Sequence, residues 1–363
     1  MLLAWFDLTP TSFQVGCFVT GWMAGWLMWW RPRSLPRGSS ARDAVSVVVP
    51  ARNEEASIGT LIASVVPQLR AGDELVVVDD HSTDATAIIA GAAGAVVLAA
   101  AELPAGWAGK PHSCHLGAEH TAGEIIVFLD ADVRLGAGAL DGLAAALAAA
   151  PDDLVSVQPW HHTVRGYEQC SLPFNLAALM GSAAFTVAGT RVAPHVAFGP
   201  VIAMRRDRYA AIGGHAHPSV RGAVLEDIAL ARLVERSWLF TGSSPGTSFR
   251  MYPSGFRSLA EGWMKGIGIG VAATPWWALV GTAAWIASVA GGAITSPWFA
   301  IATWAQVAVM ARRAGGFRWW AVFAAPLLMG FFALVSVRSV VRRRTGGTVR
   351  WKGRVLRPDQ DTG

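Results

Sequence analysis

Residues 124–132 read EIIVFLDAD, an apolar run that leads directly into two acids, Asp130 and Asp132. The run predicts a buried strand, because near-continuous apolar strands are typical of parallel sheets covered on both faces. Side chains two residues apart in an extended chain point the same way, so the two carboxylates converge on one point. Such a pair suits a hard divalent cation, Mn²⁺ or Mg²⁺, although a solvated turn is the competing interpretation of an isolated Asp-x-Asp.

Two earlier segments repeat the pattern of a strand followed by polar residues. Residues 44–50 (AVSVVVP) and 74–79 (ELVVVD) predict strands, and helices are expected from Asn53 and from Thr83 onward. This alternation predicts a doubly wound α/β sheet, parallel or mixed. Ligands of such sheets bind beyond the carboxyl ends of the strands, and the polar residues lie there.

The loops after these strands each have two interpretations. Asn53 is a good helix cap, while the same loop and Arg52 can cradle a nucleotide. In the second loop Asp84 is expected to cap the following helix. Asp79 and Asp80 come too early for capping, and we expect them to accept hydrogen bonds from a base or a ribose.

Three further charged residues are candidates for the chemistry. Glu226 and Asp227 precede an amphipathic helical pattern. An acid pair at a helix start is common, but a carboxylate there can also act as the general base that deprotonates an acceptor hydroxyl. Lys110 ends a glycine-bearing loop and either contacts phosphate or is an exposed lysine.

The composition predicts a soluble domain held between membrane anchors. Hydrophobic residues make up 53% of the 363 residues, and the first thirty positions and the stretch beyond Gly270 are nearly free of acids. Four apolar runs are candidate spans: residues 13–30, 271–290, 294–311 and 319–337. The first is interpreted as an uncleaved anchor rather than a signal peptide, because its basic residues follow it.

The net charge of +5 comes mainly from arginines beside these apolar runs, which predicts cytoplasmic flanks that contact anionic headgroups. These arginines are Arg31, Arg33, Arg37, Arg42 and Arg342 to Arg344. Four spans conflict with two cytoplasmic flanks, so one run can be re-entrant. Nucleic-acid binding is not expected, since the central domain has no basic stripe with interleaved aromatics. Three scattered cysteines exclude a disulfide framework.

The predicted organisation has five parts: an anchor (1–31), a linker (32–43), a catalytic domain (44–265), C-terminal spans (266–341) and a basic cytoplasmic tail (342–363). Within the catalytic domain, residues 172–203 are apolar but interrupted by prolines, Arg191 and His195. We expect interfacial or acceptor-lining helices there, and a buried helix pair is an almost equal alternative.

The ordered set VPARNEE, VVDDHSTD, FLDAD and LED resembles the family 2 glycosyltransferases of the GT-A fold over roughly residues 45–265. The loop 106–110, the sequence Gly213-Gly214-His215 and residues 347–354 look like its membrane-bound branch. That branch includes ceramide glucosyltransferase-like, hopanoid-associated and carotenoid (diaponeurosporenoate-type) glycosyltransferases.

The resemblance implies an inverting transfer from a metal-bound nucleotide-sugar, with roles for particular residues. Asp227, with Glu226, would be catalytic, and Asp132, with Asp130, would hold the metal. The donor would contact Pro50, Ala51, Arg52, Glu54, Asp79, Asp80, Lys110 and Asp130. The family's Q/R-x-x-R-W sequence is missing, and Arg257, Trp263 and Lys265 are the candidates to replace it at the diphosphate or acceptor. Its absence argues for transfer of a single sugar.

The favoured hypothesis is therefore a multi-pass membrane enzyme whose cytoplasmic domain moves a sugar from a nucleotide-sugar, with a UDP-sugar as the expected donor, to a lipid such as a carotenoid or hopanoid. Transfer to a polyprenyl phosphate is the alternative enzyme, and it would need no base because the acceptor is already an anion. From a different class, the chain can be an inactive membrane scaffold or export component that kept the fold.

Overall fold

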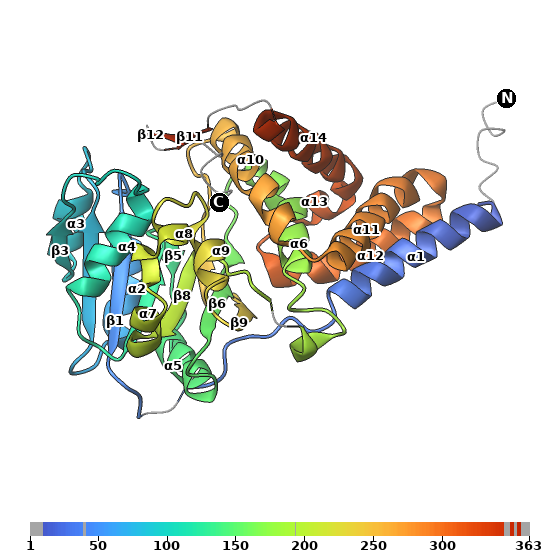
Figure 1. Cartoon of the computed structure of the whole chain (residues 1–363). Helices are drawn as coiled ribbons and strands as arrows, with labels where there is room; N and C mark the ends of the chain where they lie inside the picture. Colours follow the sequence, from blue (N-terminus) through green and yellow to red (C-terminus); the bar gives the residue numbers. More distant parts are fainter. Residues whose placement is uncertain (1–9, 39–40, 193, 345–348, 352–353, 357–363) are drawn as a thin grey trace. The chain divides into compact units, whose positions relative to one another are not determined.

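The computed structural model describes residues 10–38, 41–192, 194–344, 349–351 and 354–356 (Figure 1). Much of the expected basic tail, including most of the motif at 347–354, lies outside these residues. The chain divides into two compact units, each described here by itself. A helical unit comprises residues 1–32, 163–192 and 252–341, and a sheet unit comprises residues 33–162, 193–251 and 342–363.

The sheet unit is built on a seven-stranded sheet in the order β3-β2-β1-β4-β8-β6-β9 (Figure 1). Its strands are β1 (Val45–Ala51), β2 (Glu74–Asp79), β3 (Val96–Ala99), β4 (Ile125–Leu129), β6 (Leu154–Gln158), β8 (Val201–Arg205) and β9 (Ser237–Thr241). Every neighbouring pair is parallel except those made by β8, which is antiparallel to β4 and β6. The prediction of a doubly wound, mixed α/β sheet is confirmed.

Helices cover both faces of this sheet because its strands are apolar on both sides. In β1, Val47 and Val49 pack into one core, and Val48 packs into the core on the opposite face. The first core receives α2 (Ile58–Val65) and α5 (Ala139–Ala149). The second receives α4 (Gly109–Glu119), α7 (Arg206–Ala211), α8 (Pro218–Arg221) and α9 (Glu226–Ala231), while α3 (Thr86–Ala92) lies next to β2 and β3.

A small sheet, in the order β5-β10-β7, continues from the end of β4. Its strands are β5 (Val133–Arg134), β7 (Trp160–His161) and β10 (Ser248–Phe249). Since β5 starts directly after Asp132, this sheet fixes the turn that contains both acids of the Asp-x-Asp pair. A short hairpin, β11 (Val349–Trp351) and β12 (Arg354–Leu356), lies in the tail.

The prediction that a helix starts at Asn53 is wrong. Asn53 has a positive φ of 53°, whereas a helix cap has an extended backbone, and α2 begins only at Ile58. The Asn53 Oδ1 instead accepts a hydrogen bond from the backbone N–H of Thr83 at 2.8 Å, which ties the two loops together. The helix expected from Thr83 begins at Thr86, and Ala85 holds its cap position. Asp84 lies one residue earlier, where its carboxylate accepts the N–H of Thr86 at 3.0 Å.

The apolar run at 172–203 is not a helix pair. It contains α6 (Leu172–Gly181), which belongs to the helical unit, and it leads into β8 of the sheet unit. Residues 163–192 therefore belong to the helical unit, although the sequence analysis included them in the catalytic domain expected at 44–265. Apolar composition predicted burial here, but it did not distinguish a helix from the start of a buried strand.

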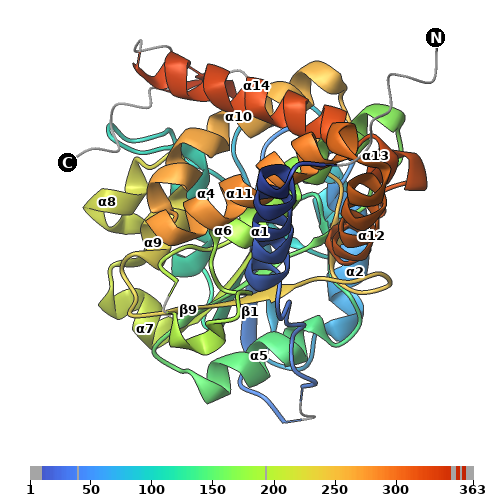
Figure 2. The same cartoon turned by 90° about the vertical axis from the view of Figure 1, so that its right-hand side faces the viewer.

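The helical unit packs α1 (Ser12–Met28) against α11 (Trp276–Thr295) and α12 (Pro297–Ala314) (Figure 2). Gly21 allows the close approach, since a Cβ there would lie 2.3 Å from the backbone oxygen of Ala284. Gln306 of α12 ties the three helices together: it accepts from the indole of Trp285 at 3.1 Å and donates to the Trp22 carbonyl at 2.7 Å. The remaining helices are α10 (Phe256–Ala273), α13 (Trp319–Phe323) and α14 (Ala325–Arg344).

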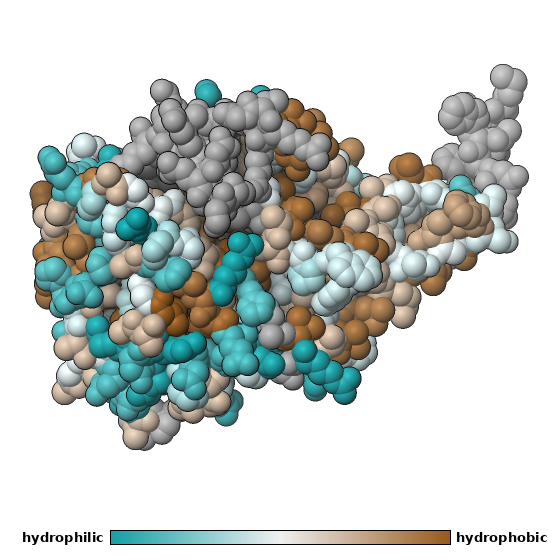
Figure 3. Space-filling model, in the orientation of Figure 1, coloured by the Kyte–Doolittle hydropathy of each residue, from teal (hydrophilic) through white to brown (hydrophobic). Residues whose placement is uncertain are grey.

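Four membrane spans are not supported. Among the described residues, α11 is the one helix long and apolar enough to cross a bilayer. The expected span at 271–290 is displaced to 276–295, because the chain breaks at Thr274 and Pro275 between α10 and α11. The helical unit nevertheless exposes large apolar side chains, and Figure 3 shows hydrophobic residues gathered over α14.

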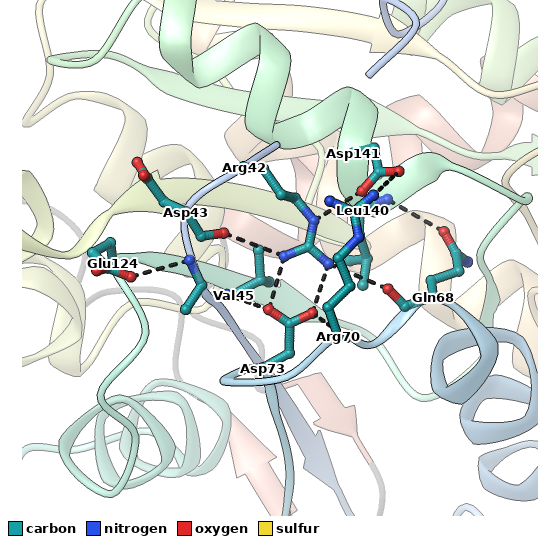
Figure 4. Close-up of polar contacts among 10 residues, drawn as sticks. Arg42, Asp43, Val45, Gln68, Arg70, Asp73, Glu124, Leu140 and Asp141 are labelled. Atoms are coloured by element: carbon teal, nitrogen blue, oxygen red, sulfur yellow. Dashed lines mark hydrogen bonds and ion pairs between the residues drawn. The ribbon is translucent and has the colours of Figure 1, made fainter. Parts of the chain in front are cut away.

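Arg42, near the end of the linker expected at 32–43, is anchored within the sheet unit (Figure 4). The Arg42 side chain is only 4% exposed and forms ion pairs with Asp73 at 2.6 Å and Asp141 at 2.8 Å. Burial alone would raise the pKa of Asp73, but Arg42 and two backbone N–H groups hold it below its ordinary value. Arg42 is therefore not available to lipid headgroups, and Arg33 instead lies over the ring of Trp238 at 5.7 Å.

Arg42→Ala is expected to lower the free energy of unfolding by about 3 kcal/mol, because it leaves the buried carboxylate of Asp73 without its cation. Arg37→Ala is the matched control, since Arg37 is exposed in the same segment. Denaturant titration of the detergent-solubilised chain measures both changes. Equal effects from the two variants would show that the Arg42 network does not anchor the segment.

Candidate active site

The order of the strands reverses between β1 and β4, and the carboxyl ends of these two strands are where ligands bind in sheets of this kind. The chain runs outward from β1 through β2 to β3 and then returns to β4 on the other side of β1. Connections on the two sides of such a point diverge, which leaves room for a ligand. Because β8 is antiparallel, its first residues lie at the same edge, and the Pro200 carbonyl accepts the N–H of Asp130 at 3.0 Å.

Lys110 joins two of the predicted acids at this edge. Its Nζ lies 2.7 Å from an oxygen of Asp130, after β4, and 2.6 Å from an oxygen of Glu226, at the start of α9. Burial would lower the pKa of Lys110, but these two carboxylates hold it well above its ordinary value, so the ammonium stays charged. The loop before Lys110 is held by a hydrogen bond from the N–H of Ala108 to the Arg221 carbonyl at 2.7 Å.

Asp227 differs from its neighbour in having no ion pair of its own among the described contacts. One of its oxygens accepts the N–H of Ile228 at 2.9 Å. Burial and the adjacent Glu226 raise the pKa of Asp227 to about 7, and Lys110 opposes this shift. A carboxylate with a pKa near the working pH has the property that a general base needs.

A second cluster lies after β1 and β2. Arg52 donates to the Asp80 carbonyl at 2.7 Å, and the N–H of Asp80 donates to the Ala51 carbonyl at 2.8 Å. One oxygen of Asp79 accepts the N–H of Ser82 at 3.3 Å. Its other oxygen is buried and accepts no hydrogen bond from the part of the chain described here. Such an acceptor suits a donor group on a ligand.

Comparison with known proteins shows the family. Residues 46–173 match the profile described as Glycosyl transferase family 2. Over 332 residues the chain is 33% identical to the 4,4'-diaponeurosporenoate glycosyltransferase of Staphylococcus aureus strain MRSA252, covering 86% of this chain and 88% of that protein. The protein of strain USA300 matches equally well, at 33% identity with the same coverage. The chain belongs to glycosyl transferase family 2.

The similarity to solved structures is lower than that to the Staphylococcus aureus proteins. The mannosyltransferase PcManGT from Pyrobaculum calidifontis, solved with GDP-Man and Mn²⁺, is 20% identical with a TM-score of 0.46, covering 89% of this chain and 96% of that one. Glucosyl-3-phosphoglycerate synthase from Mycobacterium tuberculosis is 22% identical with a TM-score of 0.42, covering 68% and 89%. The family membership and the mixed α/β sheet together assign the GT-A fold to the sheet unit of this glycosyltransferase.

The residues of this glycosyltransferase fit a metal held jointly with a substrate. No group of three or more His, Cys, Asp or Glu side chains forms a metal cluster within the described ranges. Mg²⁺ in nucleotide enzymes is commonly held by one or two carboxylates together with substrate phosphates. Asp132 and Asp130 supply such carboxylates, and one oxygen of Asp130 is already bound to Lys110.

Several predicted residues contribute to local structure in this glycosyltransferase. Pro50 and Ala51 are the last two residues of strand β1. The Glu54 carboxylate accepts a hydrogen bond from the Ser57 hydroxyl at 2.9 Å. Trp263 belongs to α10 in the helical unit, where it stacks on Phe174 with ring centres 4.9 Å apart.

The other two candidates of the missing motif also lie in α10. Arg257 pairs with Glu261 one turn away at 2.9 Å. The side chain of Lys265 lies outside the described residues. The replacement of the family motif by these residues therefore stays a prediction.

Sequence reasoning missed two supports of the acid pair. A Cβ on Gly199 would lie 3.1 Å from an oxygen of Asp227, so a larger residue there would crowd that carboxylate. His215 is fully buried, and its ring nitrogen lies 2.9 Å from the Tyr209 hydroxyl. Burial lowers the pKa of His215 to about 3, so it is neutral. The motif Gly213-Gly214-His215 was a signal for this second support, but no local pattern marked Gly199.

Asp227→Asn is expected to stabilise the protein at neutral pH, since an amide has no ionisation to suppress. The folded-state pKa, about 7, lies above the ordinary value of 3.8. Between these values the unfolded chain ionises while the folded chain stays protonated, so the parent loses stability as the pH rises through this window. Melting temperatures should therefore show a larger gain at about pH 8 than at about pH 5.

Asp207→Asn provides the control for this series, because Asp207 is largely exposed on α7 of the same unit. The control should show no comparable dependence on pH. A gain for Asp227→Asn that is the same at both pH values would contradict the raised pKa.

Proposed function

We propose that this family 2 glycosyltransferase moves a sugar, with inversion, from a nucleotide-sugar to a membrane lipid such as a carotenoid. The observation that carries the proposal is the cluster of Lys110, Asp130, Glu226 and Asp227 at the carboxyl edge of β1 and β4. Lys110 supplies a cation, Asp130 a carboxylate for the metal and the donor, and Asp227 a carboxylate whose pKa is raised to about 7, as a general base requires. An inactive scaffold has no need of Asp227, whose ionisation opposes folding.

The donor is proposed to bind across the two clusters. The unsatisfied oxygen of Asp79 and the Arg52–Asp80 pair receive the nucleoside, which we take to be uridine. Asp132 and Asp130 hold Mn²⁺ or Mg²⁺, which when bound neutralises charge on the departing diphosphate. Lys110 supplies a second positive charge at the same edge, and its two carboxylate partners keep it protonated.

Asp227 is proposed to take the proton from an acceptor hydroxyl. The carboxylate faces the bare backbone of Gly199, which leaves space beside its oxygen. Glu226 holds Lys110 in place and, by its negative charge, helps to keep the pKa of Asp227 high. A base of this kind matters only when the acceptor carries a proton at working pH.

The acceptor is proposed to be a lipid because of the relative and the helical unit. The Staphylococcus aureus relative is named for 4,4'-diaponeurosporenoate, a carboxylate. The helical unit here has a candidate span, α11, and exposes large apolar side chains on α1, α11, α12 and α14. A membrane would cover these side chains and also bring a poorly soluble acceptor to the enzyme. We place the site on the cytoplasmic side, where nucleotide-sugars occur.

Asp132→Ala is expected to abolish transfer, whichever lipid accepts the sugar. The assay follows transfer from UDP-sugars, and then from GDP- and dTDP-sugars, to extracted membrane lipids with Mn²⁺, Mg²⁺ or EDTA. EDTA should have the same effect as the substitution. Asp207→Ala is the matched control for loss of an aspartate. Transfer that persists in both EDTA and Asp132→Ala would reject the metal-bound donor.

Asp227→Asn separates the two classes of acceptor. With a lipid alcohol the variant should lower kcat by about 10²- to 10⁴-fold, because the hydroxyl must lose a proton. With a carboxylate or a polyprenyl phosphate it should be nearly silent, because these acceptors are already ionised. Transfer rates to the three acceptors, measured in parallel, test this prediction. An unchanged rate with the alcohol would remove Asp227 from the role of base.

A further inference from the structure

Helices α13 and α14 carry a row of apolar side chains that are half or more exposed, called here the stripe. Leu327 is 79% exposed and Leu334 is 67% exposed. The spacing of these residues follows the helical repeat, so they share one face. The stripe consists of Trp319, Phe323, Leu327, Leu334, Val337 and Val341. In water such a face would be expected to be polar, so the stripe requires an apolar partner.

The opposite face of α14 packs inside the helical unit. Leu328, Met329 and Val335 are buried there. The Ser339 hydroxyl donates to the Met264 carbonyl of α10 at 2.7 Å, and the rings of Phe331 and Phe256 lie 5.4 Å apart. These two contacts place residues 331–339 of α14 against residues 256–264 of α10. The outward direction of the stripe is therefore fixed by packing.

The charge around the stripe is all positive. Arg312, Arg313 and Arg318 precede α13, Arg338 lies exposed on α14, and Arg342 to Arg344 end that helix. The sequence contains no acid between Glu261 and Asp359. An apolar stripe with arginines around it is complementary to a bilayer surface that carries anionic headgroups.

We propose that the α13–α14 stripe lies flat in the interface of an anionic bilayer rather than crossing the membrane as the sequence analysis expected. Crossing would carry α10, which lies alongside, to the same depth. Its Arg257 and Glu261 side chains are 92% and 45% exposed, and charges at hydrocarbon depth are costly. In the interface these charges, and Arg338, remain within reach of water and headgroups.

The inference rests on the membrane association in the proposed function but not on the sugar-transfer chemistry. It assigns the stripe to lipid and not to a second copy of this chain, because the surrounding charge is of one sign and would repel itself across a symmetric contact. The expected partner is a bilayer with anionic lipid such as phosphatidylglycerol.

The test measures the depth of two positions on the stripe. The full chain, with Cys17, Cys114 and Cys170 replaced, carries one fluorophore on Leu327→Cys or on Val341→Cys and is reconstituted in vesicles containing phosphatidylglycerol. These positions are about 21 Å apart along the helix at 1.5 Å per residue. Quenchers attached to lipids at shallow and deep positions report the depth of each probe.

Both probes should be quenched at the same shallow depth. A depth difference approaching about 21 Å would show a crossing helix, and no quenching at either position would assign the stripe to a protein partner. Either result overturns the proposal. Glu261→Cys on α10 is the control position in the same unit, and its probe should remain accessible to a water-soluble quencher.

A charge variant tests the anionic lipid. Quenching of the probe at Leu327→Cys should depend on the phosphatidylglycerol content of the vesicles. Arg338→Glu should weaken this dependence by about fivefold or more, since each arginine near an anionic surface strengthens binding by about fivefold. Arg232→Glu, exposed in the sheet unit, is the matched control and should change nothing. Equal behaviour of the two variants would reject the electrostatic part of the proposal. Neither measurement needs a sugar donor, so loss of transfer would not affect the outcome.

Discussion

The active edge of this glycosyltransferase depends on one cation, Lys110, placed between carboxylates that would otherwise repel one another. Asp130, Glu226 and Asp227 come from two distant parts of the chain, after β4 and at the start of α9. Lys110 contacts the first two at 2.7 and 2.6 Å, which compensates their charge and fixes α9 against the strand end. The third carboxylate, Asp227, is buried beside the negative charge of Glu226; burial first and this charge second raise its pKa, and Lys110 only partly opposes them.

The two ends of the sheet differ in whether their charged side chains are paired. At the amino ends of the strands, Arg42, Asp73 and Asp141 are paired within 2.8 Å and serve stability. At the carboxyl ends, one buried oxygen of Asp79 accepts no hydrogen bond from the described residues, and Asp227 resists ionisation. Both features cost folding free energy, and both are of use once a substrate arrives. This division is expected when a rigid scaffold supports a site that is incomplete without its ligand.

The helical unit differs from the sheet unit in that many of its outward-facing side chains are apolar, whereas specific hydrogen bonds and close contacts join its helices. Gln306 and the close approach at Gly21 fix α1, α11 and α12 to one another. Small residues and buried polar bonds are the means by which helices associate where the solvent itself is apolar. The same reasoning explains why α14 can bury one face against α10 and still present an apolar face outward.

The sequence by itself determined the strands that carry the site, because their apolar runs and the acids after them are local patterns. β2 was predicted residue for residue, and β1 and β4 were predicted within one residue at each end. The pair at Asp130 and Asp132 and the helix start at Glu226 were found in the same way.

Only the tertiary structure decided which of these residues meet. The antiparallel β8, which brings Gly199 and Pro200 to the acids, follows an apolar run whose composition does not distinguish strand from helix. The burial of Arg42 was invisible because its partners, Asp73 and Asp141, are distant in sequence. Local patterns indicate the period of a segment, whereas ion pairs and a neutral His215 depend on which segments pack together.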